Sequence, residues 1–182
     1  MPLSDQGTIL VSTPVDFFPA VRRFILARSP RTPYPDADAD YILTLYRDAC
    51  LQGGVDLALA VTQMVHETAA LTSEWSQPPK RNPAGIGVTG AMDATTGLPL
   101  GQWFPTWLDA VQAHVGLLLA YRFPTGEGTA AQKRLISVIT GYRGTGIPRG
   151  VGTTINEMAI KWAADPEYAD KLVSVSSAIE KA

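Results

Sequence analysis

The stretch LALAVTQMVHETAALTS, residues 57 to 73, is the most informative part of the sequence for both the fold and the function. Apolar residues including Leu57, Val61 and Met64 recur at the spacing of one helical face, so the stretch predicts a buried helix. It contains one carboxylate, Glu67. Because burial makes an ionised carboxylate costly, we expect Glu67 to keep its proton near neutral pH. A protonated carboxyl group is what a general acid requires.

A loop of a different character follows this stretch and reads SQPPKRNPAGIGVTG over residues 76 to 90. Its prolines end regular helix, and its glycines leave the backbone bare enough to approach a ligand closely. The two neighbouring segments together predict a proton donor that faces a glycine-rich cleft.

The composition limits the classes of function that the chain can serve. Among its 182 residues, 46% are hydrophobic and 18% are charged, which fits one packed domain. The net charge of -2 argues against nucleic acid as a partner. No apolar run reaches the roughly 18 residues of a membrane span, and no signal peptide is visible at the N-terminus. The single cysteine, Cys50, lies in a helical pattern and is expected to be a buried, inert thiol.

The expected fold class is mainly α-helical, with a small loop or β-hairpin lobe that flanks a cleft. Helical patterns are expected over residues 13–28, 38–52, 56–74, 106–121, 130–140, 154–164 and 166–181. The prolines and glycines of residues 76–104 break this rhythm and predict the lobe. We expect residues 1–37 to form a tail and a helix that pack on a domain formed by residues 38–182.

Two separated motifs lie in the last two-thirds of the chain. The first combines Gln-x-x-x-Glu-[Ser/Thr], a serine-containing turn and Asn-x-x-Gly-Ile, and is matched by Gln63, Glu67, Thr68, Ser73, Trp75, Asn82, Gly85 and Ile86. The second, WAADPEYADKL at residues 162–172, is close to Tyr-Ala-Thr-Asp-Pro-x-Tyr-Ala-x-Lys-Leu. Through these motifs, roughly residues 50–180 resemble the glucosaminidase branch of lysozyme-like enzymes, glycoside hydrolase family 73 and its relatives.

The resemblance implies a lysozyme-like domain that cleaves a β-1,4 glycosidic bond, with Glu67 as the general acid. The implied substrate is peptidoglycan or a related N-acetylglucosamine polymer, and no cofactor is implied. Cleavage beside N-acetylglucosamine, rather than a muramidase reaction, is favoured by the family alone. The implied place of action is extracellular or in the cell wall, although no signal peptide is visible. The residues expected to bind substrate are Gln63, Ser73, Trp75, Asn82, Gly85, Ile86, Gly87, Tyr142 and Trp162.

The second catalytic group has more than one candidate. Glycoside hydrolysis usually uses two carboxylates, and the resemblance points to Asp93 in the lobe. Asp93 also fits a turn aspartate, and Glu74 fits a capping or surface residue better than a catalytic one. Some relatives use the acetamido group of the substrate instead.

One residue departs from the second family motif. Trp162 stands where the family has a tyrosine, and an indole can only donate through its ring nitrogen and stack. Trp162 is therefore expected either to stack on a sugar or to belong to the core. Tyr142 is a candidate to supply the missing hydroxyl group.

Other kinds of site fit the sequence poorly. His66 beside Glu67 suggests a zinc motif, but position 70 is alanine where that motif needs a second histidine. The remaining histidine, His114, is expected to be a hydrogen-bonded core residue, so no metal site is expected. The glycines of residues 141–152 lack the Lys-Ser/Thr ending of a phosphate-binding loop. The leading alternative to an enzyme is a catalytically silent carbohydrate-binding domain with the same fold.

Overall fold

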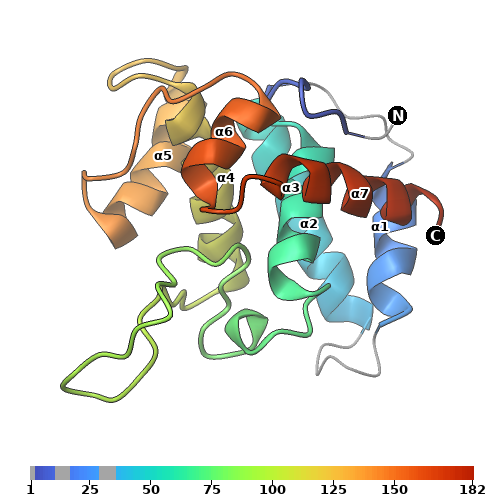
Figure 1. The fold of residues 1–182 in the computed structure, drawn as a ribbon, viewed down its shortest axis with the longest axis horizontal. Helices are drawn as coiled ribbons and strands as arrows, with labels where there is room; N and C mark the ends of the chain where they lie inside the picture. Colours follow the sequence, from blue (N-terminus) through green and yellow to red (C-terminus); the bar gives the residue numbers. More distant parts are fainter. Residues whose placement is uncertain (1–2, 11–16, 29–35) are drawn as a thin grey trace.

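The computed structural model describes residues 3–10, 17–28 and 36–182 (Figure 1). Its helices in these residues are α1 (Phe17–Leu26), α2 (Asp36–Gly53), α3 (Leu57–Thr68), α4 (Trp107–Arg122), α5 (Ala130–Arg143), α6 (Ile155–Trp162) and α7 (Tyr168–Glu180), with a 3-10 turn, η2, at Glu74–Ser76. The predicted mainly α-helical fold class is confirmed. No helix in the described part of the chain is both long and apolar enough to cross a membrane.

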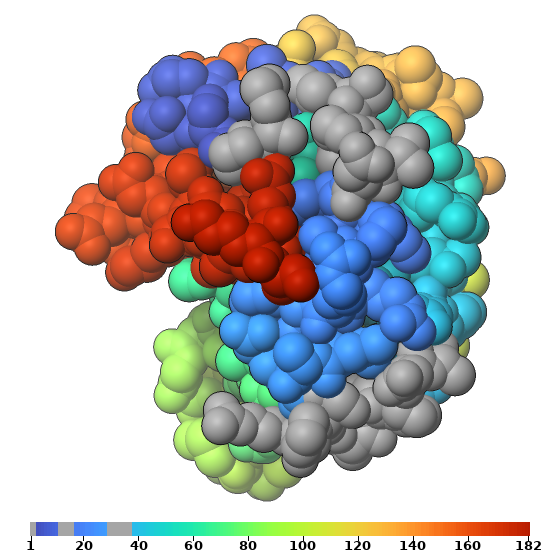
Figure 2. All heavy atoms as spheres, turned by 90° about the vertical axis from the view of Figure 1, so that its right-hand side faces the viewer, coloured from blue at the N-terminus to red at the C-terminus, as the bar shows by residue number. Residues whose placement is uncertain are grey.

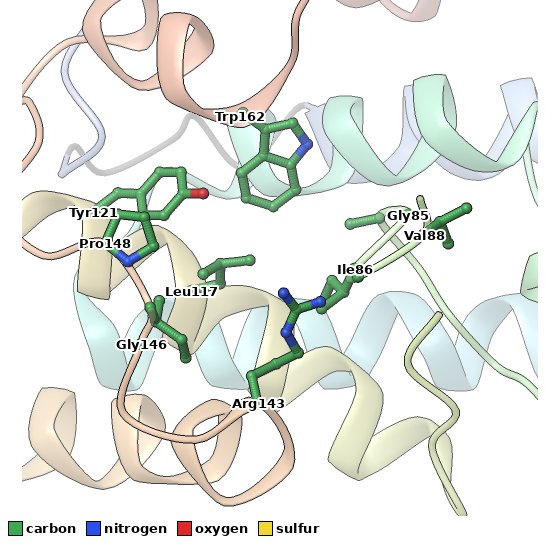
Figure 3. A pocket seen from close by; sticks show the side chains of 12 residues that line it. Gly85, Ile86, Val88, Leu117, Tyr121, Arg143, Gly146, Pro148 and Trp162 are labelled. Carbon is green, nitrogen blue, oxygen red and sulfur yellow. The ribbon is translucent and has the colours of Figure 1, made fainter. Parts of the chain in front are cut away.

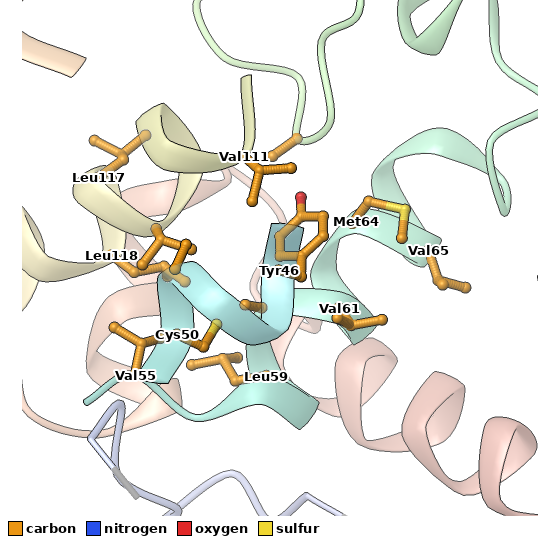
Figure 4. Close-up of a cluster of buried hydrophobic side chains, with 14 of the residues drawn as sticks. Tyr46, Cys50, Val55, Leu59, Val61, Met64, Val65, Val111, Leu117 and Leu118 are labelled. Carbon is orange, nitrogen blue, oxygen red and sulfur yellow. The ribbon is translucent and has the colours of Figure 1, made fainter. Parts of the chain in front are cut away.

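Helices α2, α3 and α4 make up the centre of the molecule, and α5 lies on the outer side of α4 (Figure 1). α4 packs against α2 and α5, and α3 packs against α2 and α7. Side chains from α2, α3 and α4 meet around Tyr46, where Leu59, Met64 and Leu118 are fully buried (Figure 4). Burial of apolar surface of this kind is the main driving force for folding. Cys50 belongs to the same cluster, which confirms the predicted buried thiol.

α1 and α7 lie side by side over one face of this core (Figures 1 and 2). The predicted start of α1, at residues 13–14, lies outside the described residues. Pro19 lies in the first turn of α1, where its missing N–H leaves no helical hydrogen bond unmade. α7 begins at Tyr168, later than predicted, because Asp165 accepts from the backbone N–H of Glu167 in the preceding turn instead of capping the helix.

α3 is shorter than the predicted helix because a strained turn ends it early. Asp56 caps its start by accepting a backbone N–H, as expected for a helix beginning there. At its other end, the Thr68 hydroxyl accepts from the backbone N–H of Leu71 at 2.9 Å. Residues 69–71 have φ angles of 49°, 57° and 65°, a left-handed conformation that is strained for residues other than glycine. Glu67 therefore lies in the last turn of α3.

The segment between η2 and α4 forms the small lobe, which extends away from the helices (Figure 1). Within the described residues, the predicted β-hairpin is reduced to one isolated antiparallel bridge between Met92 and Pro99. The proline at this bridge cannot donate to a ladder, which limits strand pairing. Turns and loops thus replace a sheet in the lobe.

Candidate active site

A cavity of about 290 Å³ lies between the lobe and the helices (Figure 3). Its walls come from the lobe, from α4, from α6, and from the end of α5 with the segment that follows it. The lining residues are Ala84, Gly85, Ile86, Gly87, Val88, Leu117, Tyr121, Arg143, Gly146, Ile147, Pro148 and Trp162. A cleft flanked by the lobe is therefore present, as predicted.

Glu67 lies half-buried at the edge of this cavity, and its two carboxyl oxygens have different surroundings. Oε1 accepts from the Trp162 indole N–H at 3.1 Å and from the Tyr168 hydroxyl at 2.6 Å. Oε2 faces Gly85, where a Cβ placed on the backbone would lie 3.1 Å from it. Gly85 and Trp162 both line the cavity, so each carboxyl oxygen has a neighbour in the cavity wall. With two donors on Oε1, a proton on the carboxyl group is best placed on Oε2.

Tyr168 is a functional candidate that the sequence analysis did not single out. Its hydroxyl receives a hydrogen bond from Gln63 Nε2 at 3.0 Å and donates to Glu67. Burial, followed by the charge of Glu67, raises the pKa of Tyr168 well above its ordinary value, so this hydroxyl keeps its proton. The sequence feature that could have pointed to Tyr168 is its position as the second aromatic residue of the motif at residues 162–172.

Trp162 lines the cavity and also donates to Glu67. Its ring makes a T-shaped contact with Tyr121, with centroids 5.7 Å apart. Tyr142, the other candidate for a missing hydroxyl, instead packs edge-on against Phe104 at 4.9 Å. Burial and then the nearby Asp109 raise the pKa of Tyr142. Tyr142 is not among the cavity residues, and the hydroxyl beside Glu67 belongs to Tyr168.

Asn82 shapes the loop that lines the cavity. It is fully buried; its Oδ1 accepts from the backbone N–H groups of Ala84 and Ile86, at 3.3 and 2.9 Å. Its Nδ2 donates to the carbonyl groups of Ile86 and Gln102, at 2.9 and 3.0 Å. These bonds occupy the Asn82 amide and hold in place the loop that carries Gly85 beside Glu67.

The two glycines of this loop are required by its geometry. Gly85 and Gly87 have φ angles of 60° and 71°, in the left-handed region that favours glycine. A Cβ at Gly85 would press on Glu67, and one at Gly87 would overlap the guanidinium of Arg143. Ile86, between them, is buried and lines the cavity.

Ser73 and Trp75 support the lobe from outside the cavity. The Ser73 hydroxyl caps η2 by accepting from the Ser76 backbone N–H at 3.4 Å. The Lys80 ammonium group lies 4.7 Å from the centre of the Trp75 ring. The Lys80 ammonium group also forms an ion pair with the carboxylate of Glu74, at the base of the lobe. Glu74 therefore fits its expected surface role.

Asp93 occupies a turn of the lobe and is partly exposed to solvent. Its Oδ1 accepts from the backbone N–H groups of Thr95 and Thr96, at 3.0 and 2.7 Å, and from the Thr96 hydroxyl at 2.9 Å. These bonds, led by that from the Thr96 backbone, lower the pKa of Asp93. The cavity's described lining holds no carboxylate, so the structure brings Glu67 to the cavity without Asp93.

The two histidines belong to the surroundings of the site. His114 is fully buried and hydrogen-bonded to Tyr46 and Gln63, which confirms the predicted core role. Burial lowers the pKa of His114 to about 3. His66 contacts the edge of the Tyr168 ring at 5.5 Å. In the part of the chain that the structure describes, no three His, Cys, Asp or Glu side chains gather as a metal-binding group.

Comparison with known proteins finds one matching family model and two similar proteins, of which one is a solved structure. A family model described as "Glucosaminidase: Mannosyl-glycoprotein endo-beta-N-acetylglucosaminidase" matches residues 43–181. An uncharacterized protein of Borreliella burgdorferi is 30% identical over 145 residues, which are 78% of this chain and 64% of that protein. This chain thus spans less than two-thirds of that relative. The crystal structure of the catalytic domain of the autolysin Auto from Listeria monocytogenes superimposes with a TM-score of 0.48 and 17% identity, covering 93% of this chain and 88% of that one.

Proposed function

The chain belongs to the glucosaminidase family, and from this membership we propose that it hydrolyses peptidoglycan at a β-1,4 bond beside N-acetylglucosamine, with Glu67 as the general acid. The observation that carries the proposal is the placement of Glu67. Its Oε1 is held by Trp162 and Tyr168, and its Oε2 faces the loop that lines the cavity. On this proposal the protein acts wherever it meets the cell wall.

In the first step, a sugar in the cavity presents its glycosidic oxygen to Oε2 of Glu67. The Oε2–H proton passes to that oxygen as the bond to the anomeric carbon breaks. Glu67 is then an anion, and the N–H of Trp162 and O–H of Tyr168 stabilise its charge. The leaving sugar departs with the proton.

The acetamido group of the substrate is the proposed second catalytic group. Its carbonyl oxygen bonds to the anomeric carbon as the leaving group departs, which gives a cyclic oxazolinium ion. Water then attacks that carbon and gives a proton to ionised Glu67, which restores both the acetamido group and the acid. Support comes from the cavity lining, whose described residues include no carboxylate, so Glu67 beside it has no acidic partner there. NMR of freshly released product should show the retained anomer, whereas inversion would require a second carboxylate such as Asp93.

Arg143 is proposed to select a substrate that carries carboxylates. It is the one charged side chain in the described lining, and its guanidinium points into the cavity (Figure 3). Neutral chitin oligosaccharides offer it no anion, whereas peptidoglycan does, through the carboxylates of its peptides or through a lactyl group that carries no peptide. Arg143→Gln should raise KM for peptidoglycan fragments about tenfold, with little change for chitin oligosaccharides, because one charge-assisted hydrogen bond is lost. An equal change for both substrates would contradict this role.

Loss of turbidity in a suspension of purified peptidoglycan tests the main proposal. The wild-type protein should clear the suspension, and Glu67→Gln should bind it without clearing it. Mass spectrometry of the released fragments should show N-acetylglucosamine at the new reducing end. A silent carbohydrate-binding domain would release no fragments in either form.

A further inference from the structure

Behind Glu67, four buried side chains from four helices form a continuous hydrogen-bonded chain. Tyr46 Oη lies 2.8 Å from His114 Nδ1, and His114 Nε2 lies 2.9 Å from Gln63 Oε1. Gln63 Nε2 lies 3.0 Å from Tyr168 Oη, which lies 2.6 Å from Glu67 Oε1. The first three side chains are fully buried and Tyr168 is 3% exposed. We call these five residues the Tyr46–Glu67 chain.

The chemistry of the groups fixes the direction in which this chain donates. The Gln63 amide nitrogen can only donate, so Tyr168 must accept from it and gives its own proton to Glu67. The Gln63 carbonyl can only accept, so His114 must carry its proton on Nε2. Nδ1 of His114 is then an acceptor, and Tyr46 must donate to it. Every donor in the chain therefore points toward Glu67.

We propose that Tyr46, through His114 and Gln63, is a positioning residue that orients the Tyr168 hydroxyl toward Oε1 of Glu67 and so keeps the acidic proton on Oε2. The inference rests on the proposed role of Glu67 as the acid. Tyr46 lies four hydrogen bonds from Glu67 and on a different helix, α2.

Reversal of the donor directions along the Tyr46–Glu67 chain would undo this arrangement. If the Gln63 amide turned over, its nitrogen would donate to His114 and its oxygen would accept from Tyr168. The Tyr168 proton would then leave Glu67, and Oε1 would keep one donor, Trp162, and could carry the acidic proton in place of Oε2. The Tyr46 hydroxyl opposes this state, because a proton on Nδ1 of His114 would leave the buried Tyr46 O–H without that acceptor. His114 suits the task because burial lowers its pKa to about 3, so the ring stays neutral and keeps one nitrogen as an acceptor.

Other titratable groups near the end of the chain are few. His66 of α3 contacts the Tyr168 ring, and Asp165, before α7, interacts with His66. Tyr121 of α4 lies near Tyr168, and Arg143 of α5 acts on Tyr121. A substitution at Tyr46 leaves all four groups in place. Shifts in the pH profile of such a variant therefore report on the Tyr46–Glu67 chain.

A double-mutant cycle of Tyr46→Phe and Tyr168→Phe tests the proposal. Tyr46→Phe should lower kcat about three- to tenfold, the range for one weakened hydrogen bond, and move the high-pH limb of kcat upward. In the Tyr168→Phe background the same change should leave kcat and the limb unaltered, because the hydroxyl that it orients is gone. The loss of stability from Tyr46→Phe, measured by urea unfolding, should appear in both backgrounds.

Thr62→Val is the matched control for removing a buried hydroxyl from this region. Thr62 precedes Gln63 on α3, is fully buried, and its hydroxyl has no partner among the described residues. This variant should keep the wild-type kcat and pH limb. Equal losses of kcat from Tyr46→Phe in both backgrounds, or no loss in the wild-type background, would overturn the proposal.

Two further measurements test the proposal. The first does not depend on catalysis, and the second does not use Tyr46→Phe. Nitrogen-15 NMR of the wild-type imidazole should show the His114 proton on Nε2 at neutral pH, and an Nδ1 proton would refute the chain. Gln63→Met breaks the chain at its centre and should reproduce the cycle with Tyr168→Phe. If Glu67→Gln proved fully active, the proposed function would fail while the NMR result still decided the direction of the chain.

Discussion

The two oxygens of the Glu67 carboxyl group have different partners. Oε1 accepts hydrogen bonds from Trp162 and Tyr168, and Oε2 faces Gly85. The donors at Oε1 would stabilise the charge that the carboxyl group carries once it has given up its proton. One carboxyl group can thus present a proton on one oxygen while the other oxygen receives hydrogen bonds.

Gly85→Ala tests the approach of the loop to Glu67. The new methyl group would lie 3.1 Å from Oε2, on a backbone with a φ of 60°. We expect kcat to fall by more than about tenfold, since small displacements at a reacting group are expensive. Gly90→Ala is the control, because Gly90 has a similar φ of 75° but no neighbour within 4 Å of its Cβ position. Equal kcat losses in the two variants would assign the effect to backbone strain alone.

His114 should make the fold sensitive to acid in a defined pH range. Burial lowers its pKa from 6.5 to about 3, so below pH 6.5 the unfolded chain takes up a proton that the folded protein does not. Its contribution to stability is complete above pH 6.5 and declines as the pH falls toward 3, by up to about 1.4 kcal/mol per pH unit. Urea unfolding between pH 6.5 and 4.5 should show this slope. His114→Phe should flatten it, and His66→Gln should leave it in place.

At the scale of the helices, sequence periodicity located the seven α-helices of the described residues but not their ends. α3 and α4 follow from their apolar patterns, yet α3 ends where the Thr68 hydroxyl meets the backbone of Leu71. Tyr168 escaped the sequence analysis because its partner Glu67 is 101 residues away, and no local pattern reports such a contact. The Asn82 loop was predicted as a sugar-binding element, but its internal hydrogen bonds depend on the folded lobe.

The contact between α4 and α5 depends on a glycine, which gives a prediction at this scale. A Cβ at Gly116 of α4 would lie 2.7 Å from the carbonyl carbon of Leu135 in α5, so the helices would have to move apart. Gly116→Ala should destabilise the protein by roughly 2–3 kcal/mol despite the better helix propensity of alanine. Gly141→Ala in α5, with nothing within 4 Å of its Cβ position, should instead stabilise by about 0.5–1 kcal/mol. Urea unfolding measures both, and a stable Gly116→Ala protein would contradict the close packing.

At the scale of the whole molecule, a helical body holds the acid and a lobe supplies the facing wall. The two parts meet at the base of the lobe, where Gln102 donates its backbone N–H to Ile86 and Asn82 bonds to both residues. The tip beyond this base carries exposed Met92 and Leu98 and lies outside the cavity lining. Base and tip should therefore contribute differently to catalysis.

Replacing residues 92–99 with an Asn-Gly turn should preserve catalysis, because the backbone hydrogen bond from Leu100 to Ala91 already closes the tip at 2.8 Å. We expect kcat on soluble peptidoglycan fragments to stay within about threefold of wild type, consistent with an effect of less than 1 kcal/mol. Asn82→Ala should lower it by more than about tenfold, because it frees four loop hydrogen bonds. The shortened lobe also removes Asp93, so a loss of activity as large as that of Glu67→Gln would place the second carboxylate in the tip and reject the acetamido route.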